Sequence, residues 1–312
     1  MREGLRVRSI VTGGAGFIGS HLVDALINRG DEVMVIDNLS TGKIENIDPR
    51  AKLIQWDIRY INFHHVTPIF KSADYVFHLA ALPKVQYSLD HPEETNAVNI
   101  NGTLNIIALA ADLNVERLIY SSSSSVYGNQ AVLPLKEDIP VNPLSPYALQ
   151  KFVGEKYCQM LCDPSKPDSL KSAVCLRYFN VYGSRQSDGN AYPSAIGIFM
   201  KNKKAGTTSV IYGGKQTRDF TWVGDVVRAN ILAAESDKVG KGEVINIGGG
   251  KSYSVLQLAE MIGGSYVHKP QKTGEPMNTL ADISKARDLL GWEPTVTLEE
   301  GIAKLKELNG LM

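Results

Sequence analysis

A glycine-rich turn near the N-terminus constrains the fold of this chain more than any other stretch. Residues 6–12 are rich in β-branched side chains and run into Thr-Gly-Gly-Ala-Gly-Phe-Ile-Gly at 12–19. The residues that follow place apolar side chains on one helical face and stop at Gly30. We therefore predict a strand, a tight turn and a helix in succession. Such a unit is typical of parallel sheets, because parallel strands need a long crossover that is usually a helix.

The same turn has the chemistry of a dinucleotide site. Its glycines permit a tight turn, a close approach of the backbone to a pyrophosphate, and close packing of the helix on the strand. The N-terminus of the helix offers free N–H groups to phosphates. Asp37 ends the next strand, where an acidic side chain accepts hydrogen bonds from ribose hydroxyls and repels a 2′-phosphate. Because Asn38 and Leu39 follow it, and no arginine, we predict NAD rather than NADP.

Strands and helices continue to alternate through the first half of the chain. Further strands are predicted at residues 32–36, 52–56, 75–79, 115–121 and 173–177, and long helices at 96–113 and 147–162. This alternation implies a parallel sheet with helices on both faces. The predicted fold class is therefore α/β, with a doubly wound parallel sheet of the Rossmann type. Ligands of such sheets bind beyond the carboxyl ends of the strands.

Residues that follow the predicted strands complete the cofactor site. Asp57 and Ile58 are expected to contact the adenine. Ala80 and Ala81 are small enough for the backbone to approach a cofactor, and Lys84 is expected near the nicotinamide ribose or the diphosphate. The predicted cofactor-binding residues are Gly13, Gly16, Phe17, Ile18, Gly19, Asp37, Asn38, Asp57, Ile58, Leu79, Ala80, Ala81, Lys84, Asn99, Ser121, Tyr147, Lys151 and Tyr178.

The second half of the chain begins with a loop-rich region and continues in shorter elements. A strand is predicted at 244–247, and helices at 225–235, 254–262, 283–290 and 298–308. Asp225 and Ser284 are predicted to cap the starts of their helices, and Gly291 to end one. Residues 1–179 are predicted as the NAD-binding domain, to which the chain returns around 221–248. Residues 180–220 and 249–312 are predicted to form a smaller, mixed α/β lobe that binds the substrate.

A tyrosine and a lysine lie four residues apart at the start of the helix predicted at 147–162. Pro146 suits the first turn of a helix, and the spacing places Tyr147 and Lys151 on one helical face. A phenol titrates near pH ~10, so it needs a nearby cation to act as a base at neutral pH. Tyr-x-x-x-Lys is also common by chance, and the alternative is an amphipathic helix with a solvated lysine.

A run of five serines, Ser121–Ser125, directly ends the strand predicted at 115–121. A serine-rich loop without function is one interpretation. The run instead follows a buried strand, at the edge of the sheet where ligands bind. A serine hydroxyl there could reach the same substrate oxygen as Tyr147.

The composition sets limits on partners and location. The chain has 33 basic and 33 acidic residues, which gives no electrostatic argument for binding nucleic acid or a membrane surface. No apolar run approaches the ~20 residues of a membrane span, and the N-terminus lacks the pattern of a signal peptide. Three cysteines and six scattered histidines form neither a disulfide framework nor a metal site. We therefore predict a cytoplasmic protein without a metal.

Taken together, these motifs resemble those of the extended short-chain dehydrogenase/reductases, and among them the nucleotide-sugar 4-epimerases. The resemblance covers essentially the whole chain and includes Arg-Tyr-Phe-Asn-Val-Tyr-Gly at 177–183 and Arg-Asp-Phe at 218–220. It implies that Tyr147 takes the proton of the sugar 4-hydroxyl while hydride moves to NAD. It also implies that Lys151 lowers the pKa of Tyr147 and that Ser123 binds the 4-oxygen. The NAD would remain bound and be recycled, and the helices at 96–113 and 147–162 would form a homodimer.

The resemblance also implies a UDP-sugar site. The residue matching the family's gate for the sugar 2-substituent is Thr279, and its small size favours UDP-GlcNAc and UDP-GalNAc, with UDP-Glc and UDP-Gal as further substrates. Lys272 stands where the family usually has arginine, which keeps the charge but loses the bidentate fork. The predicted substrate-binding residues are Lys84, Ser123, Tyr147, Asn180, Tyr192, Val210, Tyr212, Arg218, Lys272, Glu275 and Thr279.

Three alternatives use the same motifs. The 4,6-dehydratases carry Asp-Glu directly after the catalytic Ser/Thr, whereas this chain has Ser124 and Ser125 there, so dehydration is disfavoured. Decarboxylation of a nucleotide sugar stays open. A non-catalytic protein that keeps NAD as a structural or sensing ligand would have no need for Ser123, Tyr147 and Lys151 together.

Overall fold

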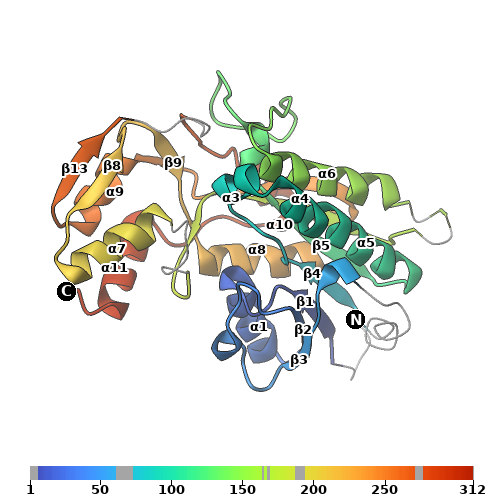
Figure 1. The fold of residues 1–312 in the computed structure, drawn as a ribbon. Coiled ribbons are helices and arrows are strands. Elements are labelled where there is room, and N and C mark those ends of the chain that lie inside the picture. The colour runs from blue at the N-terminus through green and yellow to red at the C-terminus, as the bar shows by residue number, and fades with distance from the viewer. Residues whose placement is uncertain are drawn as a thin grey trace.

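A seven-stranded parallel sheet forms the larger part of the molecule (Figure 1). The computed structural model describes residues 6–60, 73–163, 165–166, 169–186, 194–270 and 277–311. Neighbouring strands are all parallel, in the order β11-β6-β5-β4-β1-β2-β3. The strands are β1 (Arg8–Thr12), β2 (Glu32–Asp37), β3 (Lys52–Gln55), β4 (Tyr75–His78), β5 (Arg117–Ser123), β6 (Ala173–Tyr178) and β11 (Lys241–Ile247). This order is that of a doubly wound Rossmann sheet, and the predicted fold class is confirmed.

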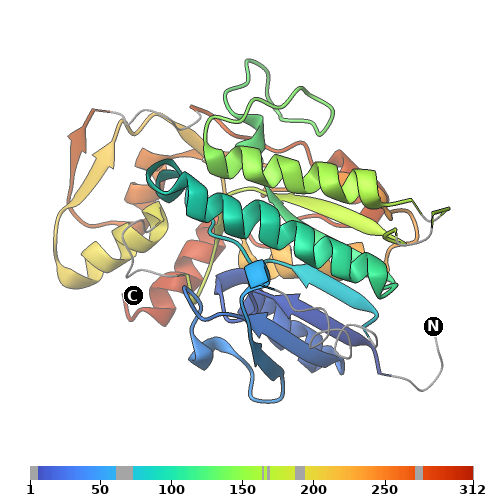
Figure 2. The same cartoon turned by 45° about the vertical axis from the view of Figure 1, so that its right-hand side comes forward.

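Helices cover both faces of the sheet. On one face α5 and α6 lie side by side, and α1 and α8 lie on the other (Figures 1 and 2). The helices of this part are α1 (Phe17–Arg29), α3 (Val85–Asp90), α4 (Pro92–Asn96), α5 (Thr103–Asp112), α6 (Pro146–Leu161), α8 (Val223–Glu235) and α10 (Ser284–Leu290). The 3₁₀ turns are η1 (Ile44–Asn46), η2 (Ile58–Tyr60) and η4 (Ser124–Tyr127). The helix predicted at 96–113 is observed as α4, a π-helical turn η3 (Ala97–Gly102) and α5 in direct succession.

The core has one apolar layer on each face of the sheet. Because side chains alternate along a strand, Val11 of β1 joins one layer and Ile10 joins the other. Both are fully buried. The consecutive buried residues of β1, β4 and β5 therefore reflect strands that are covered on both sides.

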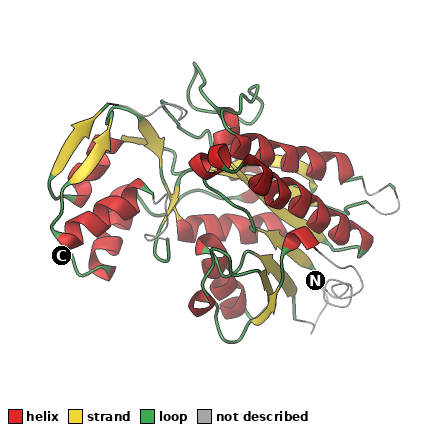
Figure 3. Ribbon diagram, viewed as in Figure 1, coloured by secondary structure: helices red, strands yellow, loops and turns green. Residues whose placement is uncertain are grey.

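A second, smaller group of elements has its own apolar core and lies beside the sheet, at the left of Figure 3. Its strands form three pairs: β8 (Ser209–Tyr212) with β13 (Tyr266–Lys269), β9 (Thr217–Asp219) with β12 (Ser252–Ser254), and β7 (Val181–Tyr182) with β10 (Thr221–Trp222). Its helices are α7 (Ala195–Ala205), α9 (Val255–Ile262) and α11 (Leu298–Leu308). The predicted domain boundaries stay a prediction.

Two predicted helix starts are wrong. Helix α8 begins at Val223 after Trp222, and Asp225 lies inside its first turn. Both Asp225 carboxylate oxygens are used to hold the segment before α11, since they accept hydrogen bonds from the backbone N–H of Thr295 and the hydroxyl of the same residue. Helix α10 begins at Ser284 itself, so Ser284 is not its cap. Gly291 ends α10 in the left-handed conformation with φ 61°, as predicted.

None of the helices in the described part of the chain combines the length and the apolar character that crossing a membrane requires.

Candidate active site

The glycine turn is packed so closely that larger residues would not fit. Gly13 has φ 73°, and a Cβ there would lie 2.7 Å from the backbone nitrogen of Ala80. A Cβ on Gly19 would lie 2.1 Å from the carbonyl oxygen of Gly13. Gly16 caps α1 without a side-chain hydrogen bond, so no side chain occupies the first N–H groups of the helix. This backbone cradle with a positive helix end fits the pyrophosphate of NAD, and Phe17 and Ile18 form the first turn of the helix.

Asp37 lies directly beside this turn. Its carboxylate accepts hydrogen bonds from the backbone N–H of Ala15 at 3.0 Å and of Leu39 at 2.8 Å. Each carboxylate oxygen has further lone pairs, so these two bonds orient the group without exhausting it. The position at the end of β2 fits the predicted contact with the ribose hydroxyls.

The residues predicted near the adenine lie at the ends of β2 and β3. Asn38 donates to the Asp57 carboxylate at 2.9 Å, and Arg59 binds the same carboxylate through two nitrogens. Hydrogen bonds from Arg59 hold the pKa of Asp57 at about 2. Ile58 is buried against Gly102, where a Cβ would lie 2.6 Å from Ile58. The prediction of NAD rather than NADP considered only the residues directly after Asp37. The fold also brings Arg59 to this region, where its guanidinium is already bound to the Asp57 carboxylate.

The loop after β4 carries Leu79, Ala80, Ala81 and Lys84, which are all half-buried. Asn99 of η3 holds this loop, since its side chain accepts from the Leu82 N–H at 2.8 Å and donates to the Leu82 carbonyl at 3.1 Å. The same amide donates to Gln150 of α6 at 2.8 Å. Asn99 therefore positions the loop and α6 relative to each other, a role that the sequence did not reveal.

The three predicted catalytic residues come together at the carboxyl end of β5. Helix α6 begins there because the Ser145 hydroxyl caps it, accepting from the Ala148 N–H at 3.2 Å, and because Pro146 occupies its first turn. The phenol of Tyr147 lies near Ser123, whose side chain lowers the pKa of the phenol. The ammonium of Lys151 donates to the Ser121 carbonyl at 2.8 Å.

Burial dominates the electrostatics of this cluster. It raises the pKa of Tyr147 to about 12, and the nearby Ser123 side chain opposes this rise. Burial lowers the pKa of Lys151 to about 8, against the effect of the Glu155 carboxylate. The Lys151 ammonium is directed at the Ser121 carbonyl. That Lys151 lowers the pKa of Tyr147 stays a prediction.

Two further predicted residues, Ser121 and Tyr178, bond to each other. The Ser121 hydroxyl donates to the Tyr178 hydroxyl at 3.2 Å, which donates to Asn230 of α8 at 2.8 Å. Burial raises the pKa of Tyr178 to about 12. Tyr178 therefore stays protonated, and its two hydrogen bonds connect the end of β5 with α8.

The predicted substrate residues meet around β9. The Thr279 hydroxyl accepts from the Asp219 N–H at 3.3 Å and from the Asn180 side chain at 3.5 Å. Arg218 donates to the carbonyl of Met277 at 3.2 Å. Val210 and Tyr212 are half-buried and alternate with buried neighbours along β8. Tyr192, Lys272 and Glu275 lie outside the described residues.

Asp219 is a site residue that the sequence analysis missed. Its side chain is fully buried and accepts hydrogen bonds from the backbone N–H groups of Gly249 at 2.6 Å, Gly250 at 3.2 Å and Ala281 at 3.0 Å. It therefore fixes two loops beside Thr279. The available signal was its place between Arg218 and Phe220, together with the three consecutive glycines at 248–250.

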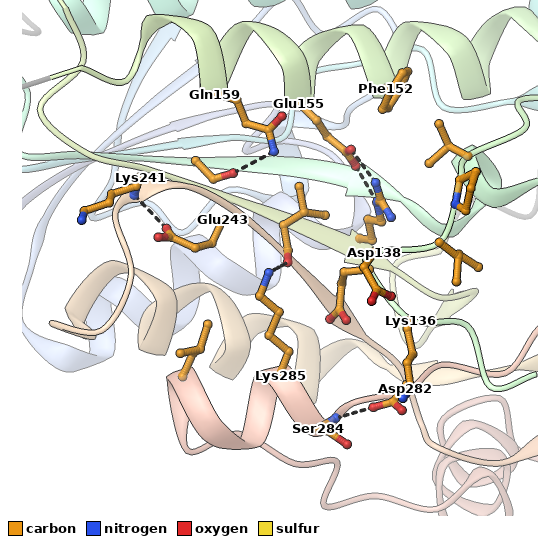
Figure 4. Close-up of a pocket in the computed structure, with 18 of the residues that line it drawn as sticks. Lys136, Asp138, Phe152, Glu155, Gln159, Lys241, Glu243, Asp282, Ser284 and Lys285 are labelled. Carbon is orange, nitrogen blue, oxygen red and sulfur yellow. Dashed lines mark hydrogen bonds and ion pairs between the residues drawn. The ribbon is translucent and has the colours of Figure 1, made fainter.

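A separate cleft of about 1080 Å³ opens at the β11 edge of the sheet, between α6, β11 and α10 (Figure 4). Gln159 and Lys285 point into it and donate to the outward carbonyls of Gly242 at 3.3 Å and Val244 at 2.7 Å. Among the described residues that line it, none belongs to the predicted site. Within the described part of the chain, no group of three His, Cys, Asp or Glu side chains is arranged to hold a metal.

Comparisons with known proteins agree with this geometry. The model of the family described as NAD dependent epimerase/dehydratase matches residues 9–248. A putative UDP-glucose 4-epimerase of Methanocaldococcus jannaschii is 39% identical over 95% of this chain and 96% of its own length. UDP-glucuronic acid decarboxylase 1 of Arabidopsis thaliana is 34% identical over 96% of this chain and 69% of its own. The solved structure of UDP-N-acetylglucosamine 4-epimerase from Methanobrevibacter ruminantium M1, in complex with UDP-N-acetylmuramic acid, is 38% identical, with a TM-score of 0.90 and coverage of 98% and 99%. The match to the family model and the identity with these relatives both show that the chain belongs to the NAD-dependent epimerase/dehydratase family.

Proposed function

We propose that this protein is an isomerase that interconverts UDP-hexoses differing in configuration at C4. The observation that carries the proposal is the convergence of Ser123, Tyr147 and Lys151 at the end of β5, on the glycine-turn side of the sheet where the cofactor fits. NAD, when bound, supplies a reversible hydride acceptor for the sugar carbon.

The three side chains have distinct tasks. Tyr147 is placed to remove the proton of the sugar 4-hydroxyl and to return it. Because burial raises its pKa to about 12, Tyr147 needs help to lose its proton, and the nearby Ser123 side chain favours the phenolate. Ser123 can contact the same sugar oxygen. Lys151, with a pKa of about 8, carries its charge at neutral pH within the buried site.

Decarboxylation of a UDP-uronic acid is the second candidate, and the 34% identity with a UDP-glucuronic acid decarboxylase favours its inclusion. Dehydration has less support. Ser124 and Ser125 follow Ser123, and the Ser125 hydroxyl donates to Ser123 at 2.9 Å. Neither serine offers the titratable acid and base that removal of water requires.

We propose that UDP-GlcNAc and UDP-GalNAc are substrates, with UDP-Glc and UDP-Gal also accepted. Thr279 is 5% exposed, and its hydroxyl is held by Asn180 and the backbone of Asp219. A small residue fixed in this way leaves room for an N-acetyl group at the sugar 2-position. The 38% identity with a UDP-N-acetylglucosamine 4-epimerase and the 39% identity with a putative UDP-glucose 4-epimerase support the two sugar pairs equally, so Thr279 carries this choice.

Conversion of UDP-GlcNAc, UDP-Glc and UDP-glucuronic acid in parallel, followed by NMR with purified protein and no added NAD, tests the proposal. We expect UDP-GlcNAc to give UDP-GalNAc, which requires both retained NAD and an open Thr279 position. Conversion of UDP-Glc alone would support the proposed 4-epimerisation but contradict the proposal that N-acetyl sugars are substrates. Loss of carbon dioxide from UDP-glucuronic acid, with no epimerisation, would favour the second candidate.

We also propose that two copies pair through α5 and α6. On α6, Leu149 and Met160 are 51% and 74% exposed, and with half-buried Val153 they form one helical stripe that faces away from the sheet. Leu104 and Ala108 of α5 are half-buried. The two helices lie side by side (Figure 2), so together they present a long apolar surface.

A further inference from the structure

Helix α6 bonds to β5 through a regular series of side chains. Tyr147, Lys151 and Glu155 are spaced by four residues and lie on one face of the helix. They reach three consecutive residues of β5, since Tyr147 lies near Ser123, Lys151 donates to the Ser121 carbonyl at 2.8 Å, and Glu155 accepts from the Ser122 hydroxyl at 2.5 Å. We call these three contacts the α6–β5 seam. Two of them involve predicted catalytic residues, and the third, at Glu155, has no role in the proposed chemistry.

A buried arginine holds the Glu155 end of the seam. Arg177 of β6 lies beside Ser122 in the strand register and binds both Glu155 oxygens, at 2.8 Å and 2.7 Å. The two side chains are only 3% and 1% exposed. The Arg177 guanidinium lies over the ring of Tyr127 at 4.6 Å, and the Tyr127 hydroxyl donates to Asn246 of β11 at 2.7 Å. The pair therefore connects α6 with three neighbouring strands and with η4, which directly follows Ser123.

Stability alone does not account for this pair. Replacing a buried ion pair by apolar side chains of similar volume is often neutral or stabilising, because desolvation of two charges offsets their attraction. The Arg177 Nη1 atom is buried and makes no hydrogen bond to any described residue, which adds a further cost. The ion pair supplies a fixed geometry that an apolar pair would not, because its two parallel hydrogen bonds hold both side chains in one orientation.

We propose that Glu155 and Arg177 are positioning residues that set the register of α6 on β5. In that register, Tyr147 meets Ser123 and Lys151 meets the Ser121 carbonyl. Glu155 is one of the residues that line the cleft at the β11 edge (Figure 4). This inference rests on the proposed function, since it assigns the pair to the same catalytic cluster.

Paired and single variants separate positioning from stability. Glu155→Met leaves the Arg177 charge buried without a partner, so we expect a lower Tm and a lower kcat. The double variant Glu155→Met/Arg177→Met removes both charges and is expected to recover most of the Tm. Its kcat should stay at least ~10-fold below wild type while KM changes less than about threefold, because a small displacement of reacting groups acts mainly on the chemical step. Lys156→Gln, next to Glu155 but exposed, is the matched control and should retain wild-type values.

Recovery of kcat together with Tm in the double variant would show that the pair is only structural. A crystal structure of this variant tests the register without any substrate, which matters if the wild-type protein converts no UDP-sugar and the proposed function fails. Displacement of Tyr147 from Ser123 supports the inference even then, and an unchanged seam overturns it.

Discussion

Tyr147 is the residue on which the proposed chemistry depends most directly. Tyr147→Phe removes the phenolic oxygen near Ser123 but keeps the buried ring. We expect conversion of UDP-sugar to fall by at least ~10²-fold, the usual contribution of a positioned acid–base group. The NAD content and the Tm should stay close to those of wild type. Tyr157→Phe, the same change further along α6, is the control. Undiminished conversion by Tyr147→Phe would rule out its hydroxyl as the base.

Thr279 provides a test of substrate choice that does not involve the chemistry. Thr279→Tyr fills the space beside Asn180 and Asp219, so we expect activity on UDP-GlcNAc to be abolished and activity on UDP-Glc to persist. Thr279→Ser keeps the hydroxyl that accepts from Asp219 and should retain both activities. The measurement is kcat/KM on each sugar. Equal loss on both sugars in Thr279→Tyr would contradict a gate for the 2-substituent.

For single residues, the sequence analysis found those whose partners lie within a helical turn and missed those whose partners are distant in the chain. Tyr147 and Lys151 share one helical turn, so their spacing placed them on one helical face, and the glycine turn and the serine run then favoured a joint role. Glu155 is only one turn further, but its partners Ser122 and Arg177 are 33 and 22 residues away in the chain. Asp219 was missed for the same reason, because its donors come from loops at 249–250 and 281.

The strand–turn–helix unit of β1 and α1 was predictable because glycine spacing reports backbone geometry. Helix starts were less predictable. Asp225 is a favourable cap residue by type, yet α8 begins two residues earlier, and the carboxylate is used instead to hold the segment before α11. The π-helical turn between α4 and α5 left no pattern that we recognised, although it carries the buried Asn99.

The close contact between α1 and the glycine turn makes this unit sensitive to a single methyl group. A Cβ on Gly19 would lie 2.1 Å from the Gly13 carbonyl oxygen, so α1 has to move in Gly19→Ala. We expect a loss of roughly 1–3 kcal/mol in the free energy of unfolding. We also expect loss of bound NAD, because the helix end that faces the pyrophosphate shifts with it. Chemical denaturation and NAD content measure the two effects.

Gly197→Ala in α7 is the control for this substitution. Among the residues that the structure describes, a Cβ at this position meets only the Ser194 hydroxyl, at 3.3 Å, so NAD content should stay at the wild-type level. Retention of NAD by Gly19→Ala as well would contradict the assignment of the glycine turn to the cofactor.

For the whole molecule, Asp219 links stability to pH. Burial raises its pKa to about 7, although three backbone donors oppose this. Between the unfolded pKa near ~3.9 and pH 7, the folded state thus binds more protons at this group than the unfolded state does, and its contribution to stability falls as pH rises. His78, whose pKa burial lowers to about 3, contributes the opposite slope below pH ~6.5. A comparison of variants is therefore needed to isolate Asp219.

Asp219→Asn removes the titrating group and replaces one of the two side-chain oxygens that accept hydrogen bonds from backbone N–H groups. The variant should therefore be less stable than wild type at pH 5. We expect the difference to narrow as the pH rises to 8, because only the wild-type protein then carries a buried charge here. Urea unfolding at four pH values between 5 and 8 measures this. A difference that stays constant with pH would show that Asp219 does not titrate in this range.

The apolar stripe on α6 makes the predicted homodimer testable in the intact protein. Leu149→Glu/Met160→Glu places two like charges on each copy at exposed positions, so pairing through α6 would bring four carboxylates close together and bury them. We expect wild type to elute as a dimer in size-exclusion chromatography with light scattering, and this variant as a monomer. Both side chains point away from the sheet, so the monomer should keep its Tm apart from what dimerisation added. Leu308→Glu, on the exposed side of α11, is the control and should stay dimeric. A wild-type monomer, or a dimer that persists in the α6 variant, would exclude this surface.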